Sequence, residues 1–136
     1  MNKIFLIDDD VDDQFFFKEV IESISPTLHC DTAPNGKIAL DKLKASASLP
    51  HIIFLDLNMP VMNGFDFLSQ IKKENPLSKI PVCIFTTSNV PRDKELAKEL
   101  GAQFFLTKPT DFQTLQKKLQ QILSADFSSE EYISIT

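Results

Sequence analysis

Five short apolar runs alternate with segments of helical period along this chain, and this alternation restricts the fold more than any other feature. The apolar runs cover about residues 4–7, 28–33, 51–55, 80–85 and 103–106. The helical segments cover about residues 12–23, 36–43, 65–71, 91–100 and 111–123. Such alternation is typical of βα units, and runs that are apolar at consecutive positions fit a parallel sheet covered on both faces. Right-handed crossovers then favour a doubly wound, five-stranded parallel sheet in an α/β three-layer sandwich, with strand order 2-1-3-4-5.

Polar and charged side chains follow four of these runs. Asp8 and Asp9 follow the first run, Asp56 the third, Thr86 the fourth, and Lys108 comes one residue after the fifth. The carboxyl ends of parallel strands meet at one edge of a sheet, and open α/β sheets bind their ligands there. We therefore expect these five side chains to form one site.

Three carboxylates at one edge indicate a metal ion. Mg²⁺ prefers oxygen ligands in near-octahedral geometry and takes few carboxylates, which leaves positions for water and phosphate oxygens. Asp9, Asp56 and the backbone carbonyl of Asn58 can supply such ligands, with Asp8 holding a coordinated water. Mg²⁺ is therefore the expected cofactor.

Asp56 is also the best candidate for a nucleophile, because it stands alone at the end of the central strand with an open loop after it. A carboxylate can accept a phosphoryl group as an aspartyl phosphate. The charge on the transferred group must be met by cations and hydrogen-bond donors, and Lys108, Thr86 and loop amides can provide these. The Lys108–Pro109 bond is a candidate for a cis peptide, because X–Pro bonds in tight turns are where cis occurs.

Composition excludes several other classes of protein. The 136 residues predict one domain, and the formal net charge of −5 argues against a non-specific nucleic-acid binder, which needs a basic surface. No apolar run reaches the length of a membrane span or a signal peptide, so we expect a cytoplasmic protein without a membrane partner. Cys30 and Cys83 lie in different predicted strands and are expected to be reduced.

The last residues belong to none of the βα units. We assign residues 1–125 to the domain and residues 126–136 to an acidic tail. The polar start of this tail predicts a flexible extension. Its alternating end, Tyr132 to Ile135, could pair with the edge of a sheet.

These residues together resemble the receiver domains of two-component response regulators. The resemblance rests on Asp8-Asp9, on Asp56 with Asn58-Met59-Pro60 and Asn63-Gly64, on Thr86, and on Lys108-Pro109. Each motif alone is weak, but the ordered set is specific and spans about 120 residues. The resemblance implies a flavodoxin-like fold and a phosphorylation switch, and the 136-residue length leads us to expect the stand-alone, single-domain type.

The family further implies roles for single residues. Asp56 accepts the phosphoryl group from a sensor histidine kinase or a histidine phosphotransfer protein, and Mg²⁺ is held by Asp9, Asp56 and the Asn58 carbonyl with Asp8 assisting. Thr86 then moves toward the phosphoryl group and Phe105 swings inward, which alters the surface offered to an output protein. From this resemblance we expect a monomer or a phosphorylation-dependent homodimer, and not an enzyme beyond its own phosphoryl transfer and dephosphorylation.

Other functions remain open from the residues alone. A receiver-like binding module that is never phosphorylated usually lacks an acid or the lysine, and both are present here. An aspartyl-phosphate phosphatase would need a cap or substrate pocket, which no segment supplies. A flavodoxin-type cofactor carrier would need a phosphate-binding loop after the first strand, and a calcium loop would need glycine where Asp13 stands.

Two observations add to this interpretation. Asp10, Asp12 and Asp13 are assigned no chemistry, because acids favour the amino end of a helix through its dipole. Thr87 departs from the family, in which the position after Thr86 is commonly small. Its bulk could change the approach of a phosphodonor or of water.

Overall fold

The fold was analysed in a computed structural model that describes residues 3–125 and 133–135. The elements in chain order are β1 (Lys3–Ile7), α1 (Val11–Ile24), β2 (His29–Ala33), α2 (Gly36–Ala45), β3 (Ile52–Leu55), α3 (Gly64–Ile71), the 3-10 turn η1 (Leu77–Lys79), β4 (Val82–Thr86), α4 (Pro91–Glu99), β5 (Phe104–Thr107), α5 (Phe112–Leu123) and β6 (Ile133–Ile135). Among the described helices, none is long and apolar enough to cross a membrane.

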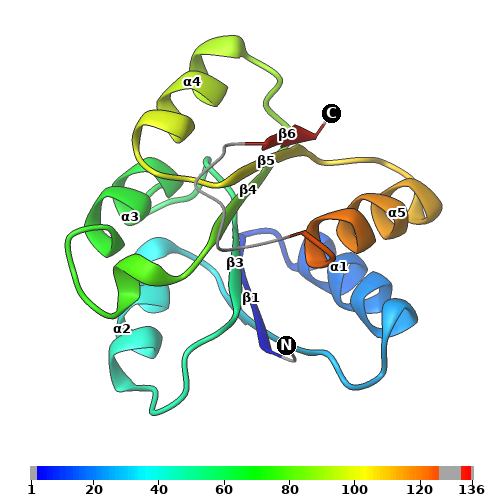
Figure 1. The fold of residues 1–136 in the computed structure, drawn as a ribbon, viewed down its shortest axis with the longest axis horizontal. Coiled ribbons are helices and arrows are strands. Elements are labelled where there is room, and N and C mark those ends of the chain that lie inside the picture. The colour runs from blue at the N-terminus through cyan, green and yellow to red at the C-terminus, as the bar shows by residue number, and fades with distance from the viewer. Residues whose placement is uncertain (1–2, 126–132, 136) are drawn as a thin grey trace.

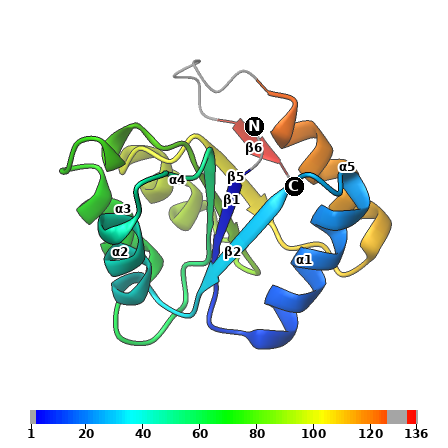
Figure 2. The same cartoon turned by 90° about the horizontal axis from the view of Figure 1, so that it is seen from below.

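One parallel sheet runs through the middle of the molecule in the order β2-β1-β3-β4-β5-β6. The order of the first five strands confirms the predicted doubly wound topology. Helices α1 and α5 cover one face of the sheet, and α2, α3 and α4 cover the other (Figures 1 and 2). The three-layer α/β sandwich is therefore the fold.

The strands divide their side chains between two cores. On β1, Ile4 and Leu6 pack with the cluster under α1 and α5, whereas Phe5 and Ile7 pack with the cluster under α2, α3 and α4. This division follows from the two-residue period of a strand, in which successive side chains point to opposite faces. A run that is apolar at every position is thus buried on both sides.

The helices differ in how firmly they are attached. Helices α1, α2, α3 and α5 each have a capping side chain that accepts a hydrogen bond from a backbone amide of the first turn. The capping residues are Asp10, Asn35, Asn63 and Asp111 respectively. Helix α4 has no such side-chain cap, and Ala97 is its one fully buried residue. Each of the other four helices buries at least three residues, so α4 is the helix with the thinnest buried face.

A sixth strand adds to the five predicted strands, at the end of the tail that was expected to be able to pair with a sheet edge. Residues Ile133–Ile135 form β6, which pairs in parallel with β5 and lies beside it in Figure 1. The register places Ser134 opposite Phe105. The prediction of a flexible tail over 126–136 otherwise concerns residues 126–132 and 136, which lie outside the described residues.

Candidate functional site

The ends of β1 and β3 bring two of the expected carboxylates together. The backbone amide of Asp8 donates to the carbonyl of Ala33 at 3.0 Å, and that of Asp56 donates to the carbonyl of Ile7 at 2.9 Å. Sheet pairing therefore continues one residue beyond these strands, and it fixes the backbone from which the Asp8 and Asp56 side chains extend. Asp8 and Asp56 are buried, whereas Asp9 is exposed.

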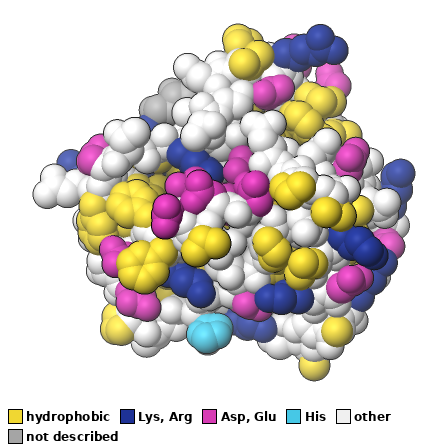
Figure 3. Space-filling model, turned by 180° about the vertical axis from the view of Figure 1, so that it is seen from behind, with side chains coloured by type: hydrophobic (Ala, Val, Ile, Leu, Met, Phe, Trp, Pro, Cys, Tyr) yellow, Lys and Arg dark blue, Asp and Glu magenta, His cyan; other side chains and the backbone are white. Residues whose placement is uncertain are grey.

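Asp8, Asp9 and Asp56 form a cluster in which one oxygen of each lies within 4.8 Å of the others. Asp9 and Asn58 also line one hollow of about 370 Å³. Magnesium and calcium ions prefer such carboxylate and carbonyl oxygens, so the donor set fits a hard divalent cation. Burial raises the pKa of Asp8 above its ordinary value, against a hydrogen bond from Lys108 that lowers it. Acidic side chains also gather near the middle of the face shown in Figure 3.

Lys108 is the cation of the site and has three carboxylate partners. Its Nζ lies 2.7 Å from Asp8 Oδ2, 2.8 Å from Asp13 Oδ2 and 3.2 Å from Asp56 Oδ2. Burial by itself lowers the pKa of Lys108, but the hydrogen bonds to Asp13 and Asp8 and the charge of Asp56 outweigh it. The pKa is therefore raised above its ordinary value, and the side chain stays an ammonium ion.

The two oxygens of Asp56 have different surroundings. Oδ1 accepts a hydrogen bond from the backbone amide of Leu57 at 2.8 Å, and Oδ2 accepts one from Lys108. The carboxylate is thus held by its own loop and directed toward the ammonium group. This geometry presents a nearly buried carboxylate next to a cation, as a phosphoryl acceptor requires.

The loop between β3 and α3 passes close behind Asp56. A Cβ on Gly64 would lie 2.8 Å from the Cα of Leu57 and closer still to the Asp56 carbonyl, so glycine is required there. Val61 has a φ of 69°, a left-handed conformation that is rare for a β-branched residue. Such strain persists where the surrounding structure fixes it, often at functional sites.

The two predicted switch residues, Thr86 and Phe105, have partners other than the three clustered carboxylates. Thr86 is fully buried, and its Oγ1 accepts a hydrogen bond from the amide of Ser88 at 3.4 Å. Phe105 is also fully buried, with Lys94 Nζ 5.8 Å from its ring centroid. The inward position expected of Phe105 after phosphorylation is therefore already occupied in this structure.

The segment after β5 corrects one expectation. The amide of Lys108 donates to the carbonyl of Thr86 at 2.7 Å, so sheet pairing continues to this residue. No tight turn is needed here, and trans is the lower-energy form of an X–Pro bond. Among the described residues the cis bond is Asn75–Pro76, so the expectation of a cis Lys108–Pro109 bond is wrong.

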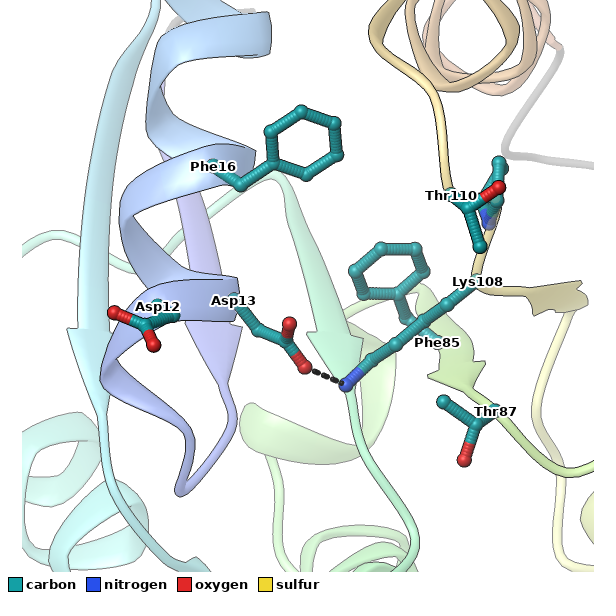
Figure 4. Close-up of a pocket in the computed structure, with 8 residues that line it drawn as sticks. Asp12, Asp13, Phe16, Phe85, Thr87, Lys108 and Thr110 are labelled. Atoms are coloured by element: carbon teal, nitrogen blue, oxygen red, sulfur yellow. Dashed lines mark hydrogen bonds and ion pairs between the residues drawn. The ribbon is translucent and has the colours of Figure 1, made fainter.

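Asp13 is the site residue that the sequence interpretation missed. It lies in the first turn of α1 and lines a hollow of about 390 Å³ with Lys108, Phe16 and Phe85, where the Lys108 ammonium lies 5.5 Å from the Phe85 ring centroid (Figure 4). A signal for it existed, because side chains on a helix lean toward its amino end. Helix α1 follows β1, so its first turn lies at the carboxyl edge of the sheet. An acidic side chain in that first turn can therefore reach the site.

Comparison with known proteins agrees with this geometry. Residues 4–120 match the family described as the response regulator receiver domain. The chain is 32% identical to Protein PilH of Pseudomonas aeruginosa, over 91% of this chain and 99% of PilH.

Solved structures give the same result. The phosphorylated cyanobacterial phytochrome response regulator RcpA superposes with a TM-score of 0.81 at 29% identity, covering 89% of this chain and 90% of RcpA. The Mn²⁺-bound form of response regulator Rcp1 superposes with a TM-score of 0.77 at 30% identity, covering 91% and 93% of the two chains. With the fold, the acid cluster and the lysine in place, the chain belongs to the response regulator receiver domains of two-component signalling.

Proposed function

We propose that this protein is a phosphorylation-switched signalling module in which Asp56 accepts a phosphoryl group from a sensor histidine kinase or a histidine phosphotransfer protein. The observation that carries the proposal is the position of the Asp56 carboxylate. It lies at the carboxyl edge of the sheet, 3.2 Å from the Lys108 ammonium, in a cluster with two further carboxylates. The related structures of phosphorylated RcpA and of Mn²⁺-bound Rcp1 support the phosphorylation and the metal binding in this proposal.

The reaction is a displacement at phosphorus. An oxygen of Asp56 attacks the phosphorus of a phosphohistidine, the P–O bond forms as the P–N bond breaks, and the leaving imidazole takes up a proton from solvent. The negative charge of the phosphoryl oxygens has to be met by donors already in place. Lys108 provides one of them, and the Thr86 hydroxyl can provide another after it leaves Ser88.

Asp8, Asp9, Asp56 and the carbonyl of Asn58 are the residues that would hold Mg²⁺. When bound, the ion supplies positive charge toward the phosphoryl oxygens and reduces repulsion between the carboxylates. The chain itself orients the carboxylates. Sheet pairing fixes the backbone of Asp8 and Asp56, and the backbone amide of Leu57 donates a hydrogen bond to one Asp56 oxygen.

The signal would pass from Thr86 to the face around α4 and β5. A new phosphoryl charge favours the state in which Thr86 and Lys108 contact it, and so shifts an existing equilibrium. Helix α4 is suited to respond because it is weakly attached, and moving elements come from regions of low stability. Phe105 on β5 already lies buried against α4, so the change would reach an output protein through movement of α4 and not through an inward swing of Phe105.

The scope of the activity is limited to the protein's own phosphoryl group. In this proposal it accepts and loses the phosphoryl group, and it acts in the cytoplasm through contacts with other proteins. Neither nucleic acid nor membrane is a partner, and the protein is a monomer or a phosphorylation-dependent homodimer.

Intact-mass spectrometry after incubation with acetyl phosphate and Mg²⁺ tests the proposal. Wild type should gain the mass of one phosphoryl group, and Asp56→Asn should gain none, because an amide is not a nucleophile at phosphorus. Asp41→Asn, which removes an exposed carboxylate on α2, serves as the matched control and should be modified like wild type.

Two results would contradict the proposal. Modification of Asp56→Asn would place the phosphoryl group on another residue. If wild type remains unmodified and fails to bind beryllofluoride with Mg²⁺, the protein acts as a binding module that is never phosphorylated.

A further inference from the structure

The Lys108 ammonium group directs its hydrogen bonds at three carboxylates in this structure, and two of these carboxylates belong to residues other than the phosphoacceptor Asp56. An ammonium group has three N–H donors, and the three carboxylates of Asp8, Asp13 and Asp56 lie at 2.7, 2.8 and 3.2 Å from it. The longest of these distances is the one to Asp56. A phosphoryl group on Asp56 can take over this longest contact as it stands, and Lys108 can move closer to it when another carboxylate releases the ammonium group.

Burial decides which carboxylate is released. The Asp8 side chain is 0% exposed, and removing the partner of a buried charge is costly. The Asp13 side chain is 41% exposed, so water can take the place of the ammonium group. Asp13 is therefore the partner that Lys108 can leave at the lower cost.

Helix α1 holds Asp13 in this position. The Asp10 carboxylate accepts hydrogen bonds from the amides of Asp12 and Asp13 at 2.9 and 3.1 Å, which fixes the first turn of the helix. In Figure 4 the Asp13 side chain points to Lys108 across the hollow, whereas the neighbouring Asp12 side chain points away from it. The two acids thus carry the same charge on one turn, and only Asp13 contacts the lysine.

We infer that Asp13 is a positioning residue that competes with the phosphoryl group for Lys108, and so sets how readily the phosphorylated state forms. Before phosphorylation, Asp13 draws the ammonium group toward α1. On phosphorylation, Lys108 exchanges Asp13 for a phosphoryl oxygen, and Asp13 is left to water. This inference rests on the proposed function and assigns a role to a residue outside the predicted acceptor, switch and metal residues.

Equilibrium binding of beryllofluoride, a phosphoryl mimic, in the presence of saturating Mg²⁺ tests the inference. Asp13→Asn should bind the mimic about three- to fivefold more tightly than wild type, which corresponds to the loss of one partly exposed ion pair. Asp12→Asn is the matched control, because it removes the same charge one position away without releasing Lys108. Asp13→Glu keeps a carboxylate on the same turn and should return the affinity toward that of wild type.

Mg²⁺ affinity, measured separately for each variant, distinguishes positioning from a general change of charge. With Mg²⁺ saturating for each variant, only Asp13→Asn should tighten binding of the mimic, whereas a general change of charge would tighten it equally in Asp13→Asn and Asp12→Asn. Equal affinities of both variants for the mimic, or weaker binding by Asp13→Asn, would overturn the inference and leave the proposed function intact. If wild type binds no mimic, the proposed function and this inference fail together.

Discussion

Asp111 joins the segment that carries Lys108 to helix α5. Its carboxylate accepts hydrogen bonds from the backbone amide and the hydroxyl of Thr114, at 2.9 and 2.8 Å. These bonds favour the ionised form, so the pKa of Asp111 lies below its ordinary value of 3.8. A carboxylate with a lowered pKa in the folded state stabilises the protein above the ordinary pKa, and this contribution is lost as the pH falls through the lowered value.

We therefore expect Asp111→Ala to lower the free energy of unfolding at neutral pH, with a difference from wild type that narrows in acid below the ordinary aspartate pKa. Urea denaturation of wild type and Asp111→Ala, at neutral pH and at a pH below the ordinary aspartate pKa, measures the difference in free energy of unfolding. Asp111→Asn is the control, because asparagine caps a helix about as well as aspartate but does not titrate. If Asp111→Ala lowers the free energy of unfolding by the same amount at both pH values, ionisation of Asp111 contributes nothing to stability.

Single residues of the site could be predicted to different extents. Asp8, Asp56 and Lys108 follow strands, and the geometry of a parallel sheet brings such positions together without further information. Asp13 could not be assigned from the same rule, because it lies on a helix and acids in a first turn are common for reasons unrelated to a site. Which carboxylates contact Lys108, and how firmly, depends on the burial of each side chain. That burial is set by the packing of the folded protein and is not visible in the sequence.

At the scale of elements, α4 and α5 are attached to the sheet very differently. Helix α5 buries Leu115, Leu119 and Ile122, whereas Ala97 is the fully buried residue of α4. Helix α4 also begins without a side-chain cap. Fewer buried apolar contacts give a lower free energy of local opening.

Native-state hydrogen exchange should therefore show less protection for the amides of α4 than for those of α5. The measurement is exchange followed by NMR on the unphosphorylated protein, with the amides of α5 as the internal reference. Equal protection in the two helices would contradict the role of α4 as the responsive element.

The pattern of apolar runs predicted the five strands and five helices because each is a local signal with a definite period. The alternation at the end of the tail indicated that it could pair with a sheet edge, but it could not say which edge or in what register, because a three-residue strand carries little periodic signal. Its pairing depends on β5 having an open edge beside it. Edge strands readily accept another strand. The position of β6 is therefore determined by the free edge of β5 more than by the sequence of the tail.

At the scale of the whole molecule, the acid cluster concentrates negative charge in a protein that is already acidic. The formal net charge is −5, and three carboxylates of the site lie within 4.8 Å of one another. Like charges at this distance repel in the folded state, while the unfolded chain separates them. Lys108 offsets part of this repulsion through its contacts with Asp8 and Asp56, and a bound cation would offset more of it.

Mg²⁺ should consequently raise the thermal stability of the protein. A ligand that binds only the folded state at ten times its dissociation constant adds about 1.4 kcal/mol to the free energy of unfolding. Melting temperature measured against Mg²⁺ concentration, at constant ionic strength, gives the size of the effect. Asp9→Asn removes the exposed carboxylate of the cluster and should lose most of the Mg²⁺ response, whereas Asp41→Asn should keep it. The same response in Asp9→Asn as in wild type would mean that the cation acts elsewhere on the acidic surface and not at the three carboxylates.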